Sequence, residues 1–548
     1  MESKSGFDSR TILVIIVCMG IWLGWQQYLE KKYPEPVAPP VEKSTTVTDA
    51  APLTGKPTKE RSFTQPAAHA AISEESENLS NIPETPWTYE DSNWKVTISN
   101  KGGRVSEISL KKYTDRDGKP IVLVSSKEPG YLLTSVRGSI DPKLSALNYT
   151  IKELAKDTVQ LRATRDGVNI TKTLKIVPED YIIKDQTTID GKTSGIQNVV
   201  VQVSQPEPKE GQSSGSFLNR GAGGDIQEYF FNHGTKTNRH LTTAKDPIGK
   251  TYDQTHFASL GSRYFTTLLF NRGNVVPTGE AAHRESYSFL EMNYPVLDQN
   301  SPISLNVELY AGPKVLNQLK RVDEQAAQVV DFGFFSWIAL PLLEVMKYFY
   351  KIFNNYGVAI IALTILVRAI TFPFTYMSFK SMRAMQKIQP ELKRLKEIYK
   401  DNTQQLNQET MKLMRDNKVN PAGGCLPLLL QLPVFWALYQ VLQNSIELYH
   451  SPFILWIQDL SMKDPYYILP VLMGLSMLIQ QKITPNTMDP AQAKVMMFMP
   501  LFFAFLMMSL PAGLTLYIFV STIFGVIQQV YMVREPAGGA SPALVRRT

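Results

Sequence analysis

Long apolar runs without acidic residues fill the C-terminal part of the chain, and they constrain the fold more than any other sequence feature. A helix needs about 20 mainly apolar residues to cross a bilayer, and a soluble core rarely contains several such runs in succession. We therefore expect five membrane-spanning helices in this part of the chain. They are expected at residues 357–376, 424–446, 465–481, 495–511 and 513–532.

A further apolar run lies at the N-terminus, from Thr11 to Tyr28, after Lys4 and Arg10. A cleaved signal peptide is the competing interpretation, but no small-x-small cleavage site follows the run. We interpret residues 1–29 as an uncleaved transmembrane anchor, which brings the expected number of spans to six.

The segment between the anchor and the C-terminal spans divides into two parts. Residues 30–84 are rich in Pro, Ala, Ser and Thr and too poor in apolar residues to bury a core, so they are expected to form a flexible linker. Residues 85–325 contain short alternating or β-branched runs such as WKVTIS and ISLNVELY, with turn signals between them. Many short strands with few helical patterns predict an all-β sandwich.

Residues 331–353 are apolar and aromatic but include Pro341, Glu344, Lys347 and Lys351. This composition favours an amphipathic helix lying in the membrane interface, and a packed connector helix is the alternative.

The orientation follows from a basic segment, 378–420, which is long enough for a hairpin of two helices. Its Lys380–Asn420 stretch holds ten Lys or Arg against five acidic residues. Because positive charge close to span ends favours the cytoplasm, this hairpin is expected inside. Both termini, including a short tail at 534–548, are then cytoplasmic, and residues 30–356 lie outside.

Several classes of function are not supported by the sequence. The net charge of +7 suits cytoplasmic loops and anionic lipids rather than specific nucleic-acid binding. Cys18 and Cys425 offer neither a disulfide framework nor a metal site. AKDPIGKT at 244–251 lacks the first glycine of a phosphate loop, and the histidines show no metal-ligand spacing. We expect no cofactor and no metal.

Arg368 is the one residue in these spans whose charge demands an explanation, because a cation there costs from about 2.5 kcal/mol upward. No Asp or Glu lies in the predicted spans after the β domain. Arg368 could snorkel to the headgroups, bond to backbone carbonyls, or line a water-filled cavity. Other polar residues in the spans favour a shared groove, although each alone is typical of helix–helix contacts. The candidate groove residues are Arg368, Thr364, Gln431, Tyr517, Ser521, Thr522 and Gln528.

The basic hairpin carries methionines beside its positive charges. Flexible thioethers next to cations suit a surface that contacts varied apolar helices or anionic lipids, whereas a solvated helical face is the alternative. The candidate residues of this surface are Met382, Arg383, Met385, Lys387, Met411 and Met414.

Several motifs resemble one protein family. NPAGGCLPLLLQLPVFWALY (420–439), DPYYILPVLMG (464–474), FMP (498–500), PAGLTLYIFVST (511–522) and IQQ (527–529) are similar in order and spacing to segments of the YidC/Oxa/Alb membrane insertases. The resemblance is strong over 332–533 and extends to the Gram-negative type with a large periplasmic domain. It implies a five-helix insertase core at 357–533 and a periplasmic supersandwich related in fold to mutarotase-like domains.

The resemblance also implies a function and partners. The family inserts nascent membrane proteins through a hydrophilic groove that contains one important arginine, which corresponds to Arg368, with Thr364 and Tyr517 as neighbours that contact substrate. The implied partners are nascent substrates, the lipid bilayer, the SecYEG/SecDF translocon and the ribosome. The implied location is the bacterial inner membrane, and no enzymatic activity is expected.

Two other functions remain as alternatives. A secondary transporter or channel is disfavoured because a single intramembrane cation without carboxylates makes a poor ion relay, and no inverted repeat is visible among the five spans. A carbohydrate-active β domain would need an acid/base pair, and no constellation singles out one of its histidines. These are His233, His240, His256 and His283.

Overall fold

The computed structural model describes residues 85–534 except 116, 208–226, 235, 243–248, 285, 300, 401, 418, 420–425 and 485–489. The predicted anchor and linker lie outside the described residues, as does the tail beyond residue 534. The described residues form two compact units, one within residues 85–313 and the other from residue 314 to residue 534. We call them the β unit and the helical unit and describe each by itself.

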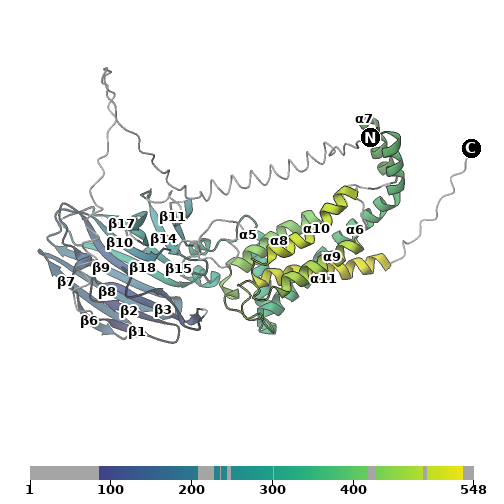
Figure 1. Cartoon of the computed structure of the whole chain (residues 1–548). Coiled ribbons are helices and arrows are strands. Elements are labelled where there is room, and N and C mark those ends of the chain that lie inside the picture. Colours follow the sequence, from purple (N-terminus) through teal and green to yellow (C-terminus); the bar gives the residue numbers. More distant parts are fainter. Residues whose placement is uncertain are drawn as a thin grey trace, which may run out of the picture. The chain divides into compact units, whose positions relative to one another are not determined.

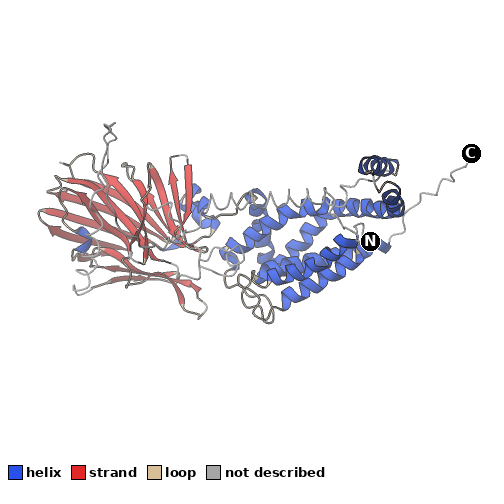
Figure 2. Cartoon of the chain, turned by 45° about the horizontal axis from the view of Figure 1, so that its top comes forward, coloured by secondary structure: helices blue, strands red, loops and turns tan. Residues whose placement is uncertain are grey.

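The β unit contains all the described strands (Figures 1 and 2). They are β1 (Trp87–Glu90), β2 (Trp94–Ser99), β3 (Arg104–Thr114), β4 (Pro120–Val124), β5 (Tyr131–Gly138), β6 (Thr150–Ala155), β7 (Thr158–Arg165), β8 (Val168–Val177), β9 (Ile182–Gly191), β10 (Ile196–Pro206), β11 (Glu228–His233), β12 (Lys236–Leu241), β13 (Thr251–Tyr252), β14 (Thr255–Gly261), β15 (Phe265–Asn271), β16 (Thr278–Arg284), β17 (Tyr287–Pro295) and β18 (Ile303–Pro313). Two short 3₁₀ helices, η1 (Leu144–Ala146) and η2 (Pro178–Asp180), connect strands.

These strands form two nine-stranded sheets. The first has the order β1-β2-β3-β5-β10-β17-β16-β13, with β4 also paired to β3, and the second has the order β12-β11-β14-β15-β18-β9-β8-β7-β6. All pairs among the described strands are antiparallel. The predicted all-β sandwich is confirmed.

Strand β8 shows how the sequence produces this fold. Val168, Ile170, Leu174 and Ile176 alternate with more exposed residues and are buried, as expected for a strand with one face on the core. Lys172 occupies the same inward row and is fully buried. A cation therefore lies in the core of the sandwich.

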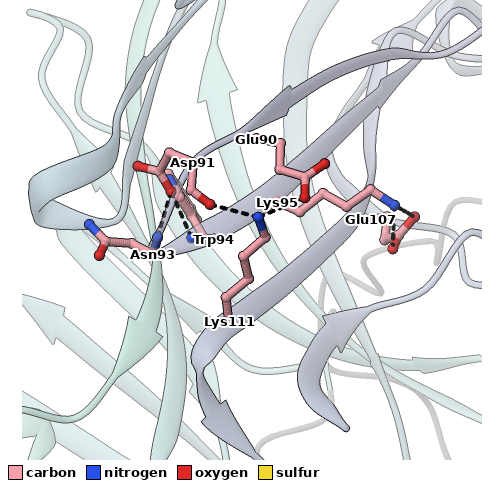
Figure 3. A network of polar contacts seen from close by, with 7 residues as sticks. All are labelled: Glu90, Asp91, Asn93, Trp94, Lys95, Glu107 and Lys111. Atoms are coloured by element: carbon pink, nitrogen blue, oxygen red, sulfur yellow. Dashed lines mark hydrogen bonds and ion pairs between the residues drawn. The ribbon is translucent and has the colours of Figure 1, made fainter.

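The turn from β1 to β2 is fixed by polar contacts (Figure 3). The Asp91 carboxylate accepts hydrogen bonds from the backbone N–H groups of Asn93 (2.7 Å) and Trp94 (2.8 Å), as aspartate does in many turns. The Lys111 ammonium reaches both the Asp91 carbonyl (2.7 Å) and the Glu90 carboxylate (2.6 Å), and it lowers the pKa of Glu90. Together these contacts set the register that places Trp94 in the core.

The helical unit begins with two short elements, α4 (Leu316–Val322) and the 3₁₀ helix η3 (Glu324–Val329). Its further elements are α5 (Ser336–Phe353), α6 (Tyr356–Ile398), α7 (Thr403–Asp416), α8 (Leu426–Asn444), η5 (Ile446–Leu448), α9 (Ile468–Ile483), α10 (Pro490–Met507) and α11 (Ala512–Arg534).

Helix α6 is longer than the sequence indicated. It continues for 43 residues, through residue 378 where the hairpin was expected to begin, so α6 supplies the first helix of the hairpin and α7 the second. Pro373 and Pro390 lie inside it. A proline removes one backbone hydrogen bond without necessarily ending a helix in a membrane protein.

By length and composition, two described helices could cross a membrane: α6 and the Ala512–Met532 part of α11. Ile468–Ile483 and Met497–Met507 are shorter apolar helices. Helix α11 packs against α9 and α6, α6 packs against α5 and α8, and α10 packs against α9. Large side chains on α10 point outward, including Phe498 (63% exposed), Leu501 (66%) and Phe505 (70%). Apolar surface exposed on this scale indicates contact with lipid or with another protein.

Candidate functional site

Arg368 lies in the first half of α6 and is bound to α11 by its guanidinium group. Its Nε and one terminal nitrogen both donate to the Ser521 hydroxyl oxygen, at 2.8 and 2.6 Å. Ser521 is 4% exposed, so this contact lies in the packed interface of the two helices. Among the described residues, the structure pairs no carboxylate with Arg368. Because an arginine has five N–H donors, the guanidinium keeps donors for water or for an incoming acceptor.

A second polar contact continues from the first toward α8. Tyr517 lies four residues before Ser521 and thus on the same face of α11. Its hydroxyl accepts a hydrogen bond from the Gln431 amide at 2.7 Å, and its side chain is 2% exposed. Arg368, Ser521, Tyr517 and Gln431 therefore form a row across three helices, which we call the polar seam.

Thr364 and Thr522 do not join this row. The Thr364 hydroxyl donates to the Ile360 carbonyl of its own helix at 2.6 Å, and Thr522 donates to the Ile518 carbonyl at 2.7 Å. Both side chains are buried. Buried threonines commonly satisfy their hydroxyl group in this way. Their sequence positions were compatible with a shared groove, but their observed bonds are local.

Gln528 lies seven residues beyond Ser521 and lines a pocket of about 370 Å³ between α6 and α11. Its Oε1 atom is buried without a hydrogen-bond partner in the structure. The other walls are Ala369 and Phe372 of α6 and Ile527 and Tyr531 of α11. The sequence alone did not indicate these wall residues. Their helical spacing from Arg368 and Gln528 was the available signal, but apolar residues at that spacing are usual in any helix interface.

The candidate residues of the hairpin occupy two helices that pack on each other, α6 and α7. Met382, Met385 and Met414 are partly exposed, Lys387 is exposed, and Met411 is 68% exposed. The Arg383 guanidinium lies over the Phe379 ring at 5.1 Å, a cation–π contact that the i, i+4 spacing allows. The hairpin thus presents thioethers and cations together.

The fold and the polar seam together define a class: a helical membrane protein with buried polar groups among its apolar helices and a large antiparallel β-sandwich. Two family models match this chain. One is described as the YidC periplasmic domain and covers residues 87–345. The other is described as a 60Kd inner membrane protein and covers residues 348–537.

Relatives match over nearly the whole length. A membrane protein insertase YidC from Geobacter metallireducens is 33% identical over 97% of this chain and 99% of the relative. A protein of the same name from Oleidesulfovibrio alaskensis is 32% identical over 98% of this chain and 100% of the relative. The chain belongs to the YidC family of membrane protein insertases.

Solved structures were matched at lower similarity. The crystal structure of an active YidC insertase with its first transmembrane domain resolved is 19% identical, with a TM-score of 0.37 over 82% of this chain and 93% of that one. A putative aldose 1-epimerase from Escherichia coli K12 is 7% identical, with a TM-score of 0.29 over 42% of this chain and 99% of that one.

Proposed function

We propose that this protein inserts apolar segments of nascent membrane proteins into the bacterial inner membrane, and that it does so without enzymatic chemistry. The observation that carries the proposal is the arrangement at Arg368. A partly buried cation is held by a serine hydroxyl, with no carboxylate beside it among the described residues. Membership in the insertase family indicates the general activity, which is the insertion of proteins into a membrane.

The proposed groove has the polar seam as its wall. Water and hydroxyl groups around Arg368 would hydrate the polar end of an incoming segment and shorten the apolar barrier that it must cross. The free donors of Arg368 would attract acidic residues in that end through charge-assisted hydrogen bonds. The unpartnered Gln528 oxygen is a further acceptor on the same face, although the other walls of its pocket are mainly apolar.

Release into lipid follows from the hydrophobic effect. The apolar part of the segment leaves the groove between helices and is driven by about 25 cal/mol for each Å² of apolar surface removed from water. This scheme needs no nucleotide. The outward-facing side chains of α10 would border that path on the lipid side.

The proposed topology has six transmembrane helices. The anchor at 1–29 precedes a periplasmic linker at 30–84 and a periplasmic β domain at 85–325, and α5 of the 331–353 segment lies in the interface. The core at 357–533 includes the cytoplasmic hairpin at 378–420, and both termini, including the tail at 534–548, are cytoplasmic. The charge of the hairpin and the apolar character of α6 and α11 support this arrangement.

The hairpin is the proposed first contact for substrate. Its exposed Met411 and Lys387 pair adaptable apolar surface with positive charge, which suits nascent apolar helices near anionic lipid. The SecYEG/SecDF translocon and the ribosome are proposed partners on the basis of the family resemblance.

The test is an insertion assay in bacteria depleted of their own insertase. Wild type, Arg368→Ala and Arg368→Lys are supplied at equal abundance, and protease protection of a single-span substrate with an acidic translocated tail is measured. Lys351→Ala, which removes an exposed cation of α5, is the matched control. We expect wild type and the control to insert the substrate and Arg368→Ala to fail, while Arg368→Lys inserts partly.

A second substrate sharpens the result. When the acidic residues of the tail are replaced by Asn and Gln, the difference between wild type and Arg368→Ala should shrink. Equal insertion of the acidic substrate by both proteins would overturn the proposed role of Arg368.

A further inference from the structure

The connection between α8 and α9 contains a turn whose tip is apolar and exposed. Ile454 is 54% exposed and Leu455 is 74% exposed, although neighbouring side chains of the same connection are buried, such as Ile457 (3%) and Leu460 (1%). The connection therefore has a small core of its own and directs two aliphatic side chains away from it.

Backbone hydrogen bonds hold this turn in one conformation. The Phe453 N–H donates to the Ile457 carbonyl at 3.0 Å, and the Ile457 N–H donates to the Ile454 carbonyl at 3.2 Å. A further backbone bond joins the Leu460 N–H to the Ser451 carbonyl at 2.9 Å. These bonds close the chain on both sides of the tip.

The same turn is fastened to the start of α6. The Asn355 side chain donates to the Phe453 carbonyl at 3.0 Å, while its oxygen caps α6 at Val358. The Phe453 ring lies directly against Gly357, where an added Cβ would fall 2.0 Å from a ring carbon. The tip is therefore positioned relative to the helix that carries Arg368.

The turn is also fastened to the start of α9. The Trp456 indole N–H donates to the Asp464 carboxylate at 3.1 Å, and the other oxygen of Asp464 accepts from the Leu469 N–H at 2.7 Å. Asp464 is 2% exposed. The tip thus connects the ends of two helices through buried polar contacts.

The backbone at the tip is unfavourable for its residue. Leu455 has φ of +56°, in the left-handed region that glycine or asparagine normally occupies. A bulky residue there is strained, and strain of this kind persists where the surroundings enforce it and often serves function. An exposed leucine contributes little to the core. We therefore expect the Leu455 side chain to contact something other than this chain.

The surroundings of the tip indicate what it contacts. Tyr466 is 68% exposed and Tyr467 37% exposed, and the Lys463 ammonium lies over the Tyr467 ring at 6.0 Å. Tyrosine and lysine beside aliphatic residues are typical of the boundary between lipid headgroups and acyl chains. Directly after these tyrosines, α9 carries a row of exposed apolar residues: Ile468, Val471, Leu472, Leu475 and Ile479.

The acidic groups of the connection are directed elsewhere. Glu447 pairs with Lys347 at 3.0 Å, Asp459 lies 3.7 Å from His450, and Asp464 is buried. The tip itself presents no charge, which favours a lipid surface over a charged peptide or a soluble protein.

We propose that Ile454 and Leu455 form a rigid anchor that inserts into the outer leaflet of the membrane at the headgroup–acyl boundary. The anchor fixes the depth of the outer ends of α6 and α9. The inference rests on the proposed topology, in which this connection lies outside.

The test uses spin labels on the full-length protein in vesicles of phosphatidylethanolamine and phosphatidylglycerol. Cys18 and Cys425 are replaced by serine, and single cysteines are introduced as Leu455→Cys, Gln458→Cys and Leu475→Cys. Gln458 is the matched control because it is exposed three residues beyond the tip. Accessibility to oxygen, which concentrates in lipid, is compared with accessibility to a water-soluble nickel chelate.

We expect the oxygen-to-nickel ratio to be several-fold higher at 455 than at 458, and higher still at 475 inside α9. Equal ratios at 455 and 458 overturn the anchor. An aqueous label at 455 in vesicles that becomes protected only in native membranes also overturns it, because a protein then covers the tip.

The measurement separates this inference from the proposed function. A label at 475 that is exposed to water would refute the topology, and failure of wild type in the insertion assay would refute the function. If the topology and the function both hold, the oxygen-to-nickel accessibility ratio at residue 455 tests the proposed anchor by itself.

Discussion

Each unit of this protein carries a cation among apolar side chains, Lys172 fully buried and Arg368 partly buried, and the two are held in different ways. Lys172 in the β unit is fully buried and meets the Leu132 carbonyl (2.5 Å), the Thr134 hydroxyl (3.0 Å) and the Asp185 carboxylate (3.5 Å). Arg368 in the helical unit meets one serine hydroxyl, and no carboxylate among the described residues. Three polar partners, one of them a carboxylate, fit a structural role for Lys172, whereas the spare donors of Arg368 fit a role that involves a visiting group.

The Lys172 contacts also join the two sheets. Lys172 lies on β8 of the second sheet, and its partners Leu132 and Thr134 lie on β5 of the first. Burial lowers the pKa of Lys172, and Asp185 opposes that shift by favouring the charged form. Removing one member of the pair would leave the other buried without compensation.

We therefore expect the largest effect on stability from the removal of Asp185. Asp185→Leu leaves Lys172 in the core without its counter-charge and should lower the free energy of unfolding by about 3–5 kcal/mol. Urea unfolding of the full-length protein in detergent, followed by near-ultraviolet circular dichroism of the β unit, measures it. The double variant Lys172→Met with Asp185→Leu should recover most of the loss. A single variant as stable as wild type would contradict the role of the pair.

Arg368→Met should separate stability from function in the helical unit. Removing a partly buried cation that has no carboxylate partner among the described residues relieves a desolvation cost, so the thermal unfolding temperature in detergent should stay equal or rise. Insertion of a substrate with an acidic tail should fall by about tenfold, equivalent to about 1.4 kcal/mol of lost attraction. A large loss of stability would show that Arg368 has a structural role, like Lys172. The two cations would then not differ in the way described above.

Ser521→Ala should have an intermediate effect on the same assay. Without its acceptor, the guanidinium is free to turn away from the seam, and insertion should fall by a few-fold, in line with about 0.5–1.5 kcal/mol for one hydrogen bond. Ser521→Thr, which keeps a hydroxyl, is the control. Equal activity in both variants would show that the bond does not position Arg368.

The smallest expected effect concerns pH. Burial raises the pKa of Glu308, but hydrogen bonds and charge from Arg272 and Lys184 outweigh it and leave the pKa below its usual value near 4.5. A depressed carboxyl pKa stabilises the fold above the unfolded value, and this contribution is lost as the pH falls through the folded value. Glu308→Gln should remove under about 1 kcal/mol at neutral pH and flatten the decline in acid. An unchanged acid profile in thermal unfolding would contradict this assignment.

The sequence predicted the large divisions of the molecule because they depend on strong periodic signals. Alternating β-branched runs indicated the sandwich, and long apolar runs indicated the helices that pack around α11. The end of the first of these runs was less visible. The expected span ended at residue 376 and the basic hairpin was expected to begin at 378, yet α6 continues to Ile398.

The contacts that hold Lys172 and Arg368 were harder to predict from the sequence. Arg368 was identifiable because a charge in an apolar run stands out, but its acceptor was one of several candidate hydroxyls. Only the packing of α6 on α11 shows that Ser521 is chosen and that Thr364 bonds to its own helix. Lys172 gave no signal, because lysine within alternating strands usually faces water and only the strand register shows that it points inward.

Helix α6 connects three parts of the helical unit through one continuous helix. With 43 residues at about 1.5 Å of rise each, it extends roughly 65 Å. Its start is tied to the connection before α9, Arg368 lies in its first half, and its far end belongs to the hairpin. Pro373 removes the hydrogen bond that would join it to Ala369, a wall of the pocket with Gln528. Pro390 leaves a second gap of this kind nearer the hairpin, so we expect a load on the hairpin to bend α6 at two points, of which the one at Pro373 lies beside the pocket.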